Sequence, residues 1–271
     1  MSVTTLILFD CCFFAQRMEL TTFQITIAIL GGLVAGFINT LAGNGSAITL
    51  TILIEVLGLP PSMANGTNRV GIMAQSITGT WAFHKEGKLH LHRNLKYIIP
   101  IVIGAIGGAL LAANVSNDQF KSVFKFLMVI MLGVILVKPK RWLRATDLEK
   151  SMPLYLHIPI FLALGFYAGF IQMGMGVIFL AVMVLLAKVN IMESNAIKMM
   201  AVGLLTIFAL SIFHYKGLVD WKIGGIMAIG QATGGWATAT YVSRYKRADE
   251  VAYWVLVVIV LVAVIRLFWV G

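Results

Sequence analysis

Charged side chains are scarce in this sequence, and extended polar stretches are scarcer still. Only 12% of the 271 residues are Asp, Glu, Lys or Arg, about half the share that a soluble domain carries. Hydrophobic residues make up 59% and mean hydropathy is +0.91. Apolar runs of nearly 20 residues recur, and this length crosses ~30 Å of hydrocarbon. We therefore expect an all-α integral membrane protein without a sizeable soluble domain.

Sequence patterns of enzymes and metal sites are missing as well. The two cysteines, Cys11 and Cys12, are adjacent, and such neighbours rarely form a disulfide or hold a metal. The sequence has no His-x-x-x-His, Gly-x-Ser-x-Gly or paired acids at membrane depth, so we expect no enzyme and no cofactor. A net charge of +10 suggests nucleic acid for a soluble protein. Here the excess lies in short loops, where Lys and Arg set membrane topology, so we expect a lipid bilayer and no nucleic acid.

Breaks in the apolar runs predict ten helical segments, five in each half. They are 22–41, 44–57, 64–83, 94–113 and 119–137, followed by 153–172, 175–188, 192–213, 221–241 and 249–268. The second segment of each half is short enough to be re-entrant. The segments define a first membrane repeat over 21–137 and a second over 153–271, joined by a basic cytoplasmic linker, 138–152. Residues 1–20 are expected to form a tail, and Met18 is a candidate for the true start.

The two halves share matching stretches in the same order. Residues 32–38, Gly-Leu-Val-Ala-Gly-Phe-Ile, match residues 165–171, Gly-Phe-Tyr-Ala-Gly-Phe-Ile. His84-x-x-Gly87 likewise matches His214-x-x-Gly217, and Gly107-Gly108 matches Gly234-Gly235. The offset narrows only from 133 (32 to 165) to 127 (107 to 234), which indicates an internal duplication. Because each repeat has an odd number of segments, the two repeats are expected to run in opposite directions through the membrane.

Loop charge gives an independent prediction of topology. The stretches 84–96, 138–150 and 242–248 carry four, five and three Lys or Arg residues, whereas the loops on the other side hold mainly Lys121, Lys216 and Lys222. The basic loops are expected in the cytoplasm. Both termini are then outside, in the cell (inner) membrane, and the alternation agrees with inverted repeats, an architecture of transporters.

Polar residues and glycines interrupt the apolar sequence where the first segment of each half ends. The break in the first half contains Asn39, Gly43, Asn44, Gly45 and Ser46, and its counterpart contains Gln172, Gly174 and Gly176. Irregular backbone at membrane depth is tolerated where it is buried in protein or lines a wet cavity. A helix that begins near Ser46 directs free N–H groups into such a cavity. Close packing through small residues explains the glycines but not the amides, so we expect a substrate site.

A second polar group lies near the start of the third segment of each half. It comprises Asn65, Thr67, Asn68 and Arg69 in the first half, and Asn195 and Lys198 in the second. Two cations, two helix N-termini and several amides together predict a pocket for a small oxyanion. The alternative is that both cations extend to lipid headgroups, because each lies within about two turns of a helix end.

The stretch from Gly32 to Gly87 resembles the sulfite exporter TauE/SafE family. The resemblance is carried by the glycine-rich break, Leu57-Gly58-Leu59-Pro60-Pro61, Thr67-Asn68-Arg69 and the His-x-x-Gly end, and the second half fits from Gly165 to Gly217. Family members usually have a fuller glycine run at 43–46 and Lys in place of Arg69. The resemblance implies a transporter of sulfite, sulfonates or related small organic anions.

The expected function is therefore a secondary transporter, in the direction of export, of a small anion bound at one central site. Moving one charge through 100 mV is worth about 2.3 kcal/mol, so a dianion leaving a negative cytoplasm gains roughly 4–5 kcal/mol per 100 mV and needs no coupled ion. The alternatives are a non-transporting membrane scaffold or insertion factor, which predicts apolar packing in the breaks, and a membrane-embedded enzyme. The sequence leaves a homo-oligomer open.

Overall fold

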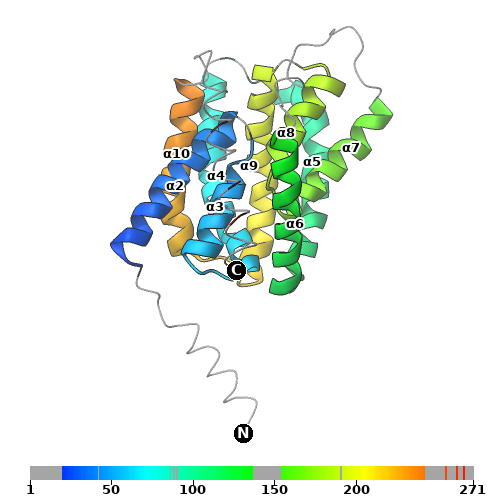
Figure 1. Ribbon diagram of the computed structural model, residues 1–271. Helices are drawn as coiled ribbons and strands as arrows, with labels where there is room; N and C mark the ends of the chain where they lie inside the picture. Colours follow the sequence, from blue (N-terminus) through cyan, green and yellow to red (C-terminus); the bar gives the residue numbers. More distant parts are fainter. Residues whose placement is uncertain are drawn as a thin grey trace.

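The computed structural model describes residues 20–41, 43–85, 87, 89, 91–136, 154–189, 191–241, 254, 261 and 265. All regular elements in these ranges are helices, as Figure 1 shows. Their order is α2 (Thr22–Leu41), α3 (Gly45–Thr51), η1 (Ile52–Val56), α4 (Pro61–Lys85), α5 (Leu91–Ala112), α6 (Asn117–Leu136), α7 (Leu154–Phe170), α8 (Met175–Ala181), η3 (Val182–Leu186), α9 (Ile191–Tyr215) and α10 (Trp221–Thr240). The all-α prediction is thus confirmed.

The first nine predicted segments each correspond to helix in the structure. By length and composition, three stretches within the described ranges can cross a membrane: Thr22–Leu41, Asn94–Ala112 and Glu193–Tyr215. The tenth predicted segment, 249–268, lies outside the described residues apart from 254, 261 and 265, and so do the linker 138–152 and all of the tail except Leu20.

The second segment of the first half folds back along α2. It comprises the seven residues of α3 and the five of the π-helical turn η1, about 18 Å at 1.5 Å per residue, which is too short to span. A Cβ on Gly45 would lie 2.2 Å from the Ala35 carbonyl oxygen, and one on Gly31 would lie 2.1 Å from Ile52 Cδ1. These two contacts place α3 and η1 antiparallel to α2.

Helices from different halves pack closely through glycines. In the pairs α2–α10 and α5–α7, a Cβ on any of eight glycines would lie 1.9–2.6 Å from a carbonyl oxygen of the partner helix. They are Gly32, Gly36, Gly230 and Gly234 in the first pair and Gly104, Gly108, Gly165 and Gly169 in the second. Each helix therefore carries a Gly-x-x-x-Gly motif, whose small residues let backbones approach. The first helix of each half packs on the fourth helix of the other.

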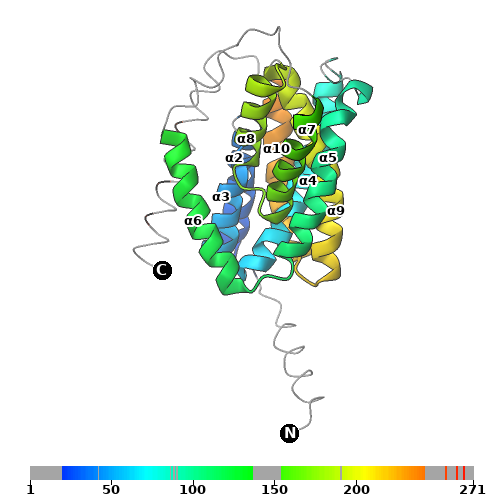
Figure 2. The same ribbon diagram turned by 90° about the vertical axis from the view of Figure 1, so that its right-hand side faces the viewer.

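The third helices of the two halves, α4 and α9, pack against each other between these pairs. Figure 1 shows α2 and α10 on one side, α5 and α7 on the other, and α4 and α9 between them. Figure 2 shows α6 at the edge of the bundle, next to α3. The breaks that follow α2 and α7 consequently lie within the protein, against α4 and α9.

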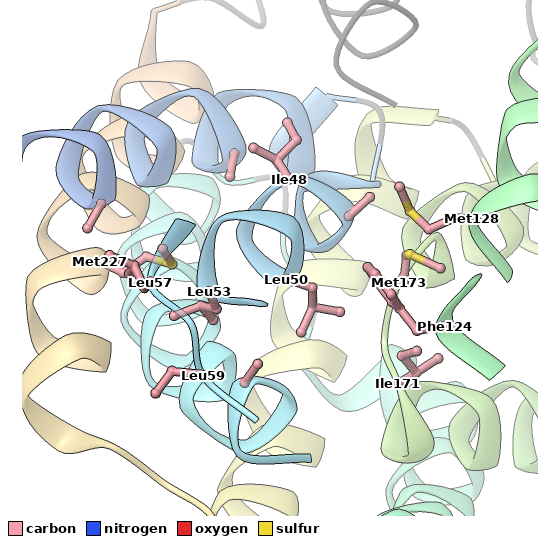
Figure 3. Packing of buried hydrophobic residues seen from close by; sticks show 14 of the residues in the cluster. Ile48, Leu50, Leu53, Leu57, Leu59, Phe124, Met128, Ile171, Met173 and Met227 are labelled. Carbon is pink, nitrogen blue, oxygen red and sulfur yellow. The ribbon is translucent and has the colours of Figure 1, made fainter. Parts of the chain in front are cut away.

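Apolar side chains surround the short helix α3 (Figure 3). Leu50 and Leu53 are fully buried, and the cluster continues into Phe124 of α6 and Met173 of the second break. Burying one such side chain stabilises the fold by about 1.5–3 kcal/mol. This packing fixes α3 in an apolar setting.

Candidate functional site

The two breaks touch each other through their backbones. Gly43 has a φ of +76°, a left-handed conformation that favours glycine. The Gly176 N–H donates a 3.0 Å hydrogen bond to the Gly43 carbonyl oxygen. A Cβ on Gly43 would lie 2.4 Å from the Gly176 carbonyl carbon, and a Cβ on Gly176 would lie 2.3 Å from Gly43 Cα. The N-terminal ends of α3 and α8 therefore lie side by side.

The second break contains two residues in the left-handed region. Gln172 has a φ of 60° and Gly174, which precedes α8, a φ of 70°. The Met173 carbonyl accepts a short hydrogen bond from the Tyr167 hydroxyl. The Gln172 side chain accepts from Arg69. Side chains of α4 and α7 thus hold this irregular backbone in one conformation.

Arg69 binds the C-terminal end of α7, a helix of the other half. Its Nη1 donates to the Ala168 carbonyl at 3.1 Å and to Gln172 Oε1 at 3.1 Å, and its Nη2 donates to the Gly169 carbonyl at 2.6 Å. Asn65, one turn earlier on α4, donates from Nδ2 to the Phe170 carbonyl at 2.8 Å. The last carbonyls of a helix lack intrahelical partners, so these two side chains complete the end of α7.

Lys198 makes the reciprocal contact with α2. Its Nζ donates to the carbonyls of Asn39 and Thr40, at 3.1 and 3.2 Å, and to Asn195 Oδ1 at 2.7 Å. Arg69 is 0% exposed and Lys198 is 2% exposed, so neither cation extends to lipid headgroups. Each half therefore provides a buried cation that caps the broken helix of the opposite half.

The electrostatic balance at the breaks is positive. A helix C-terminus carries roughly half a negative charge and an N-terminus roughly half a positive one. Each full cation more than offsets the helix end that it caps, while the N-termini of α3 and α8 add positive potential. None of the acidic side chains in the described ranges is buried: Glu55, Glu193 and Asp220 are half-buried and Asp118 is exposed. The arrangement favours an anion over a cation.

Four buried polar atoms at the breaks have no hydrogen-bond partner among the described residues. They are Nδ2 and Oδ1 of Asn44, Oδ1 of Asn65 and Nε of Arg69. Asn44 precedes α3 and is 0% exposed. Because more than nine in ten buried polar groups are satisfied, these atoms are candidate contacts for a polar ligand.

The other predicted residues do not all contact the breaks. Gly45 and Ser46 are buried in the first turn of α3. Asn68 accepts a 2.6 Å hydrogen bond from the Thr49 hydroxyl and so joins α3 to α4. Thr67 accepts from the Asp220 N–H at 2.9 Å, so its contact is with the turn before α10 and not with the breaks.

One polar residue beside the first break was not predicted. Gln75 is 1% exposed on α4. Its Oε1 accepts from Asn39 Nδ2 at 3.2 Å, and its Nε2 donates to Thr40 Oγ1 at 3.1 Å. The comparison of halves missed it because its counterpart is Leu205. The sequence offered one signal that could have identified Gln75, since an amide in the middle of a membrane segment is unusual.

A separate hollow of about 410 Å³ lies between α4 and α9. It is lined by Met73, Ser76, Ile77, Thr80, Trp81, His84, Leu89, Met200, Gly203, Leu204 and Ile207. None of the predicted site residues lines this mostly apolar hollow, so it is distinct from the breaks.

Comparison with known proteins identifies the family. Residues 28–267 match the sulfite exporter TauE/SafE family. The chain belongs to this family. Among curated relatives, it is 28% identical over 231 residues to the probable membrane transporter protein ORF9 of Sinorhizobium sp, covering 85% of this chain and 86% of that protein. It is 29% identical over 205 residues to a probable membrane transporter protein of Haemophilus influenzae, covering 75% and 79%.

A third relative is the probable membrane transporter protein YfcA of Escherichia coli (strain K12), with 27% identity over 221 residues, 78% of this chain and 80% of YfcA. No solved structure matches the chain. The TauE/SafE family assignment and the apolar helices establish the chain as a transporter located in a membrane.

Proposed function

We propose that this TauE/SafE-family member exports a small anion, such as sulfite, an organosulfonate or a related sulfur-containing or organic anion, across the inner membrane. The substrate binds where the breaks after α2 and α7 meet, and access alternates between the two sides. The observation that carries the proposal is the reciprocal capping: Arg69 and Lys198 place two buried positive charges beside two adjoining helix N-termini.

Matching backbone details support two inverted repeats as the frame of this site. The elements α3, η1 and α4 recur as α8, η3 and α9 with every bound shifted by 130 positions, from 45 to 175 and from 61 to 191. Gly58 and Lys188, also 130 apart, both take the left-handed conformation, with φ of 68° and 56°. Gly87 and Gly217 do the same, at φ of 68° and 70°.

Labelling tests the inverted topology. Single cysteines at positions 140 and 216, introduced after the two native cysteines are replaced, are expected to react with membrane-impermeant reagents from opposite sides, because 140 belongs to the predicted cytoplasmic linker. Labelling of both from the same side contradicts the inverted arrangement. Position 140 lies outside the described residues, whereas Lys216 directly follows α9.

Transport by purified protein in liposomes tests the function. Vesicles loaded with sulfite, sulfate, sulfoacetate, taurine or a carboxylate are expected to release at least one anion faster than protein-free vesicles. Release is expected to accelerate when the compartment that holds the anion is made negative, because each charge gains about 2.3 kcal/mol per 100 mV. A folded protein that neither binds nor releases any of these compounds favours a membrane scaffold or insertion factor instead.

A further inference from the structure

Two of the unpartnered atoms at the breaks lie on one face of α4. Asn65 Oδ1 and Arg69 Nε belong to residues four positions apart, and such residues are neighbours on a helix surface. The two side chains are 1% and 0% exposed, and neither atom has a hydrogen-bond partner among the described residues. One is an acceptor and the other is a donor.

The neighbouring backbone fixes these two roles. The Asn65 amide donates from Nδ2 to the Phe170 carbonyl, and a carbonyl oxygen can only accept. Turning the amide over would place two acceptors together, so Oδ1 is the atom that remains for a ligand. Arg69 Nε–H can only donate, and both Nη atoms already donate to the end of α7 and Gln172.

A fully deprotonated dianion fits only half of this pair. Its oxygens accept from Arg69 Nε, but they present lone pairs to Asn65 Oδ1 and repel it. A singly charged oxyanion that retains one O–H satisfies both, because its charged oxygen accepts from Arg69 while its O–H donates to Asn65. Asn44, buried beside the same breaks, adds one donor and one acceptor that are also unpartnered.

From this geometry we infer that the site selects a protonated, singly charged oxyanion of the hydrogen sulfite type over a dianion, and that Asn65 is the residue that discriminates. This inference rests on the proposed anion site. A buried acceptor that faces an anionic oxygen instead of a donor weakens binding by roughly 10- to 100-fold.

Calorimetric titration of the full-length protein in detergent tests the inference with three probes in one mildly acidic buffer. Sulfite is then mostly hydrogen sulfite, methanesulfonate is a singly charged oxyanion without an O–H, and sulfate is the dianion. Hydrogen sulfite is expected to bind at least about tenfold more tightly than the other two. Equal dissociation constants, or tightest binding of sulfate, overturn the inference but leave an anion site. No binding of any probe overturns the proposed function and the inference together.

A variant of Asn65 assigns the discrimination to this residue. N65L is expected to remove the difference between hydrogen sulfite and methanesulfonate, because it removes the acceptor at this position. The matched control is N114L, because Asn114 Nδ2 also donates to a backbone carbonyl, that of Leu110 at 2.7 Å, but is exposed. A folded N65L protein that discriminates like the control overturns the role of Asn65. The wild-type titration decides the selectivity even if N65L does not fold.

Discussion

Replacing Gly43 with alanine probes the contact on which the proposed site depends. The left-handed φ of +76° costs a non-glycine residue roughly 1–2 kcal/mol. The added Cβ, 2.4 Å from the Gly176 carbonyl carbon, forces the two breaks apart, and such overpacking costs about 1–3 kcal/mol. Separation also loses the Gly176-to-Gly43 hydrogen bond, worth about 1 kcal/mol. The free energy of unfolding is therefore expected to fall by about 3–6 kcal/mol.

Two other glycines separate these contributions. Gly58 has a similar φ of 68°, but a Cβ there meets nothing within 4 Å, so G58A is expected to cost only the conformational part, roughly 1–2 kcal/mol. Gly176 has no positive φ, so G176A is expected to lower the free energy of unfolding only through the collision and the lost hydrogen bond, by about 2–4 kcal/mol. Moving the two breaks apart once relieves both collisions. The double variant G43A/G176A is therefore expected to lower the free energy of unfolding by clearly less than the sum of the two single variants.

Equilibrium unfolding in detergent, followed by tryptophan fluorescence, measures all four proteins. Transport in liposomes then shows whether the folded fraction of G43A still works, and we expect it to be strongly impaired because the helix N-termini have moved. If G43A is no less stable than G58A, the close approach of the breaks is refuted. Normal transport by G43A would instead show that the substrate site does not depend on this contact.

Three further substitutions test other parts of the structure. R69Q is expected to weaken anion binding by about 1.5–3 kcal/mol, which is the worth of a hydrogen bond to a charged group. R69K is expected to weaken binding by less, because it keeps the charge and loses only the forked geometry. A binding titration in which both variants match the wild type contradicts a role of Arg69 in binding. K188G is expected to stabilise the protein by about 1 kcal/mol, since it relieves the left-handed Lys188 (φ 56°), and an unchanged unfolding midpoint argues against this strain. G108A is expected to destabilise the α5–α7 pair, because its Cβ would lie 1.9 Å from the Phe166 carbonyl oxygen. G107A is the control, because the nearest atom to its Cβ lies at 3.6 Å. It is expected to leave the free energy of unfolding unchanged or to raise it by up to about 1 kcal/mol.

The sequence predicted the helices well because membrane helices depend on length, apolarity and breaks, all of which are local. The short second segments were visible in this way. The partners of the cations were not, because Arg69 and the Ala168 carbonyl are 99 positions apart and only tertiary packing brings them together. The sequence also gave no sign that both cations bind helix ends through their N–H groups. Gln75 was missed because its counterpart in the other half, Leu205, is apolar, and its contacts with Asn39 and Thr40 appear only in the folded protein.

The packing of the helix pairs limits how access can alternate. Each of the pairs α2–α10 and α5–α7 contains one helix from each half, and their glycines leave no room for a Cβ at the closest points. Rocking one half of the sequence against the other would open both pairs where they pack most tightly. The central helix α4 also packs closely on α10, through Gly71, Gly224 and Gly235, whereas the bonds from Arg69 to α7 and from Lys198 to α2 are polar contacts. Such contacts exchange partners at lower cost than a close-packed glycine interface separates. We therefore expect the proposed alternating access to break these polar contacts before the glycine-packed pairs separate, with Arg69 and Lys198 at the surfaces that move.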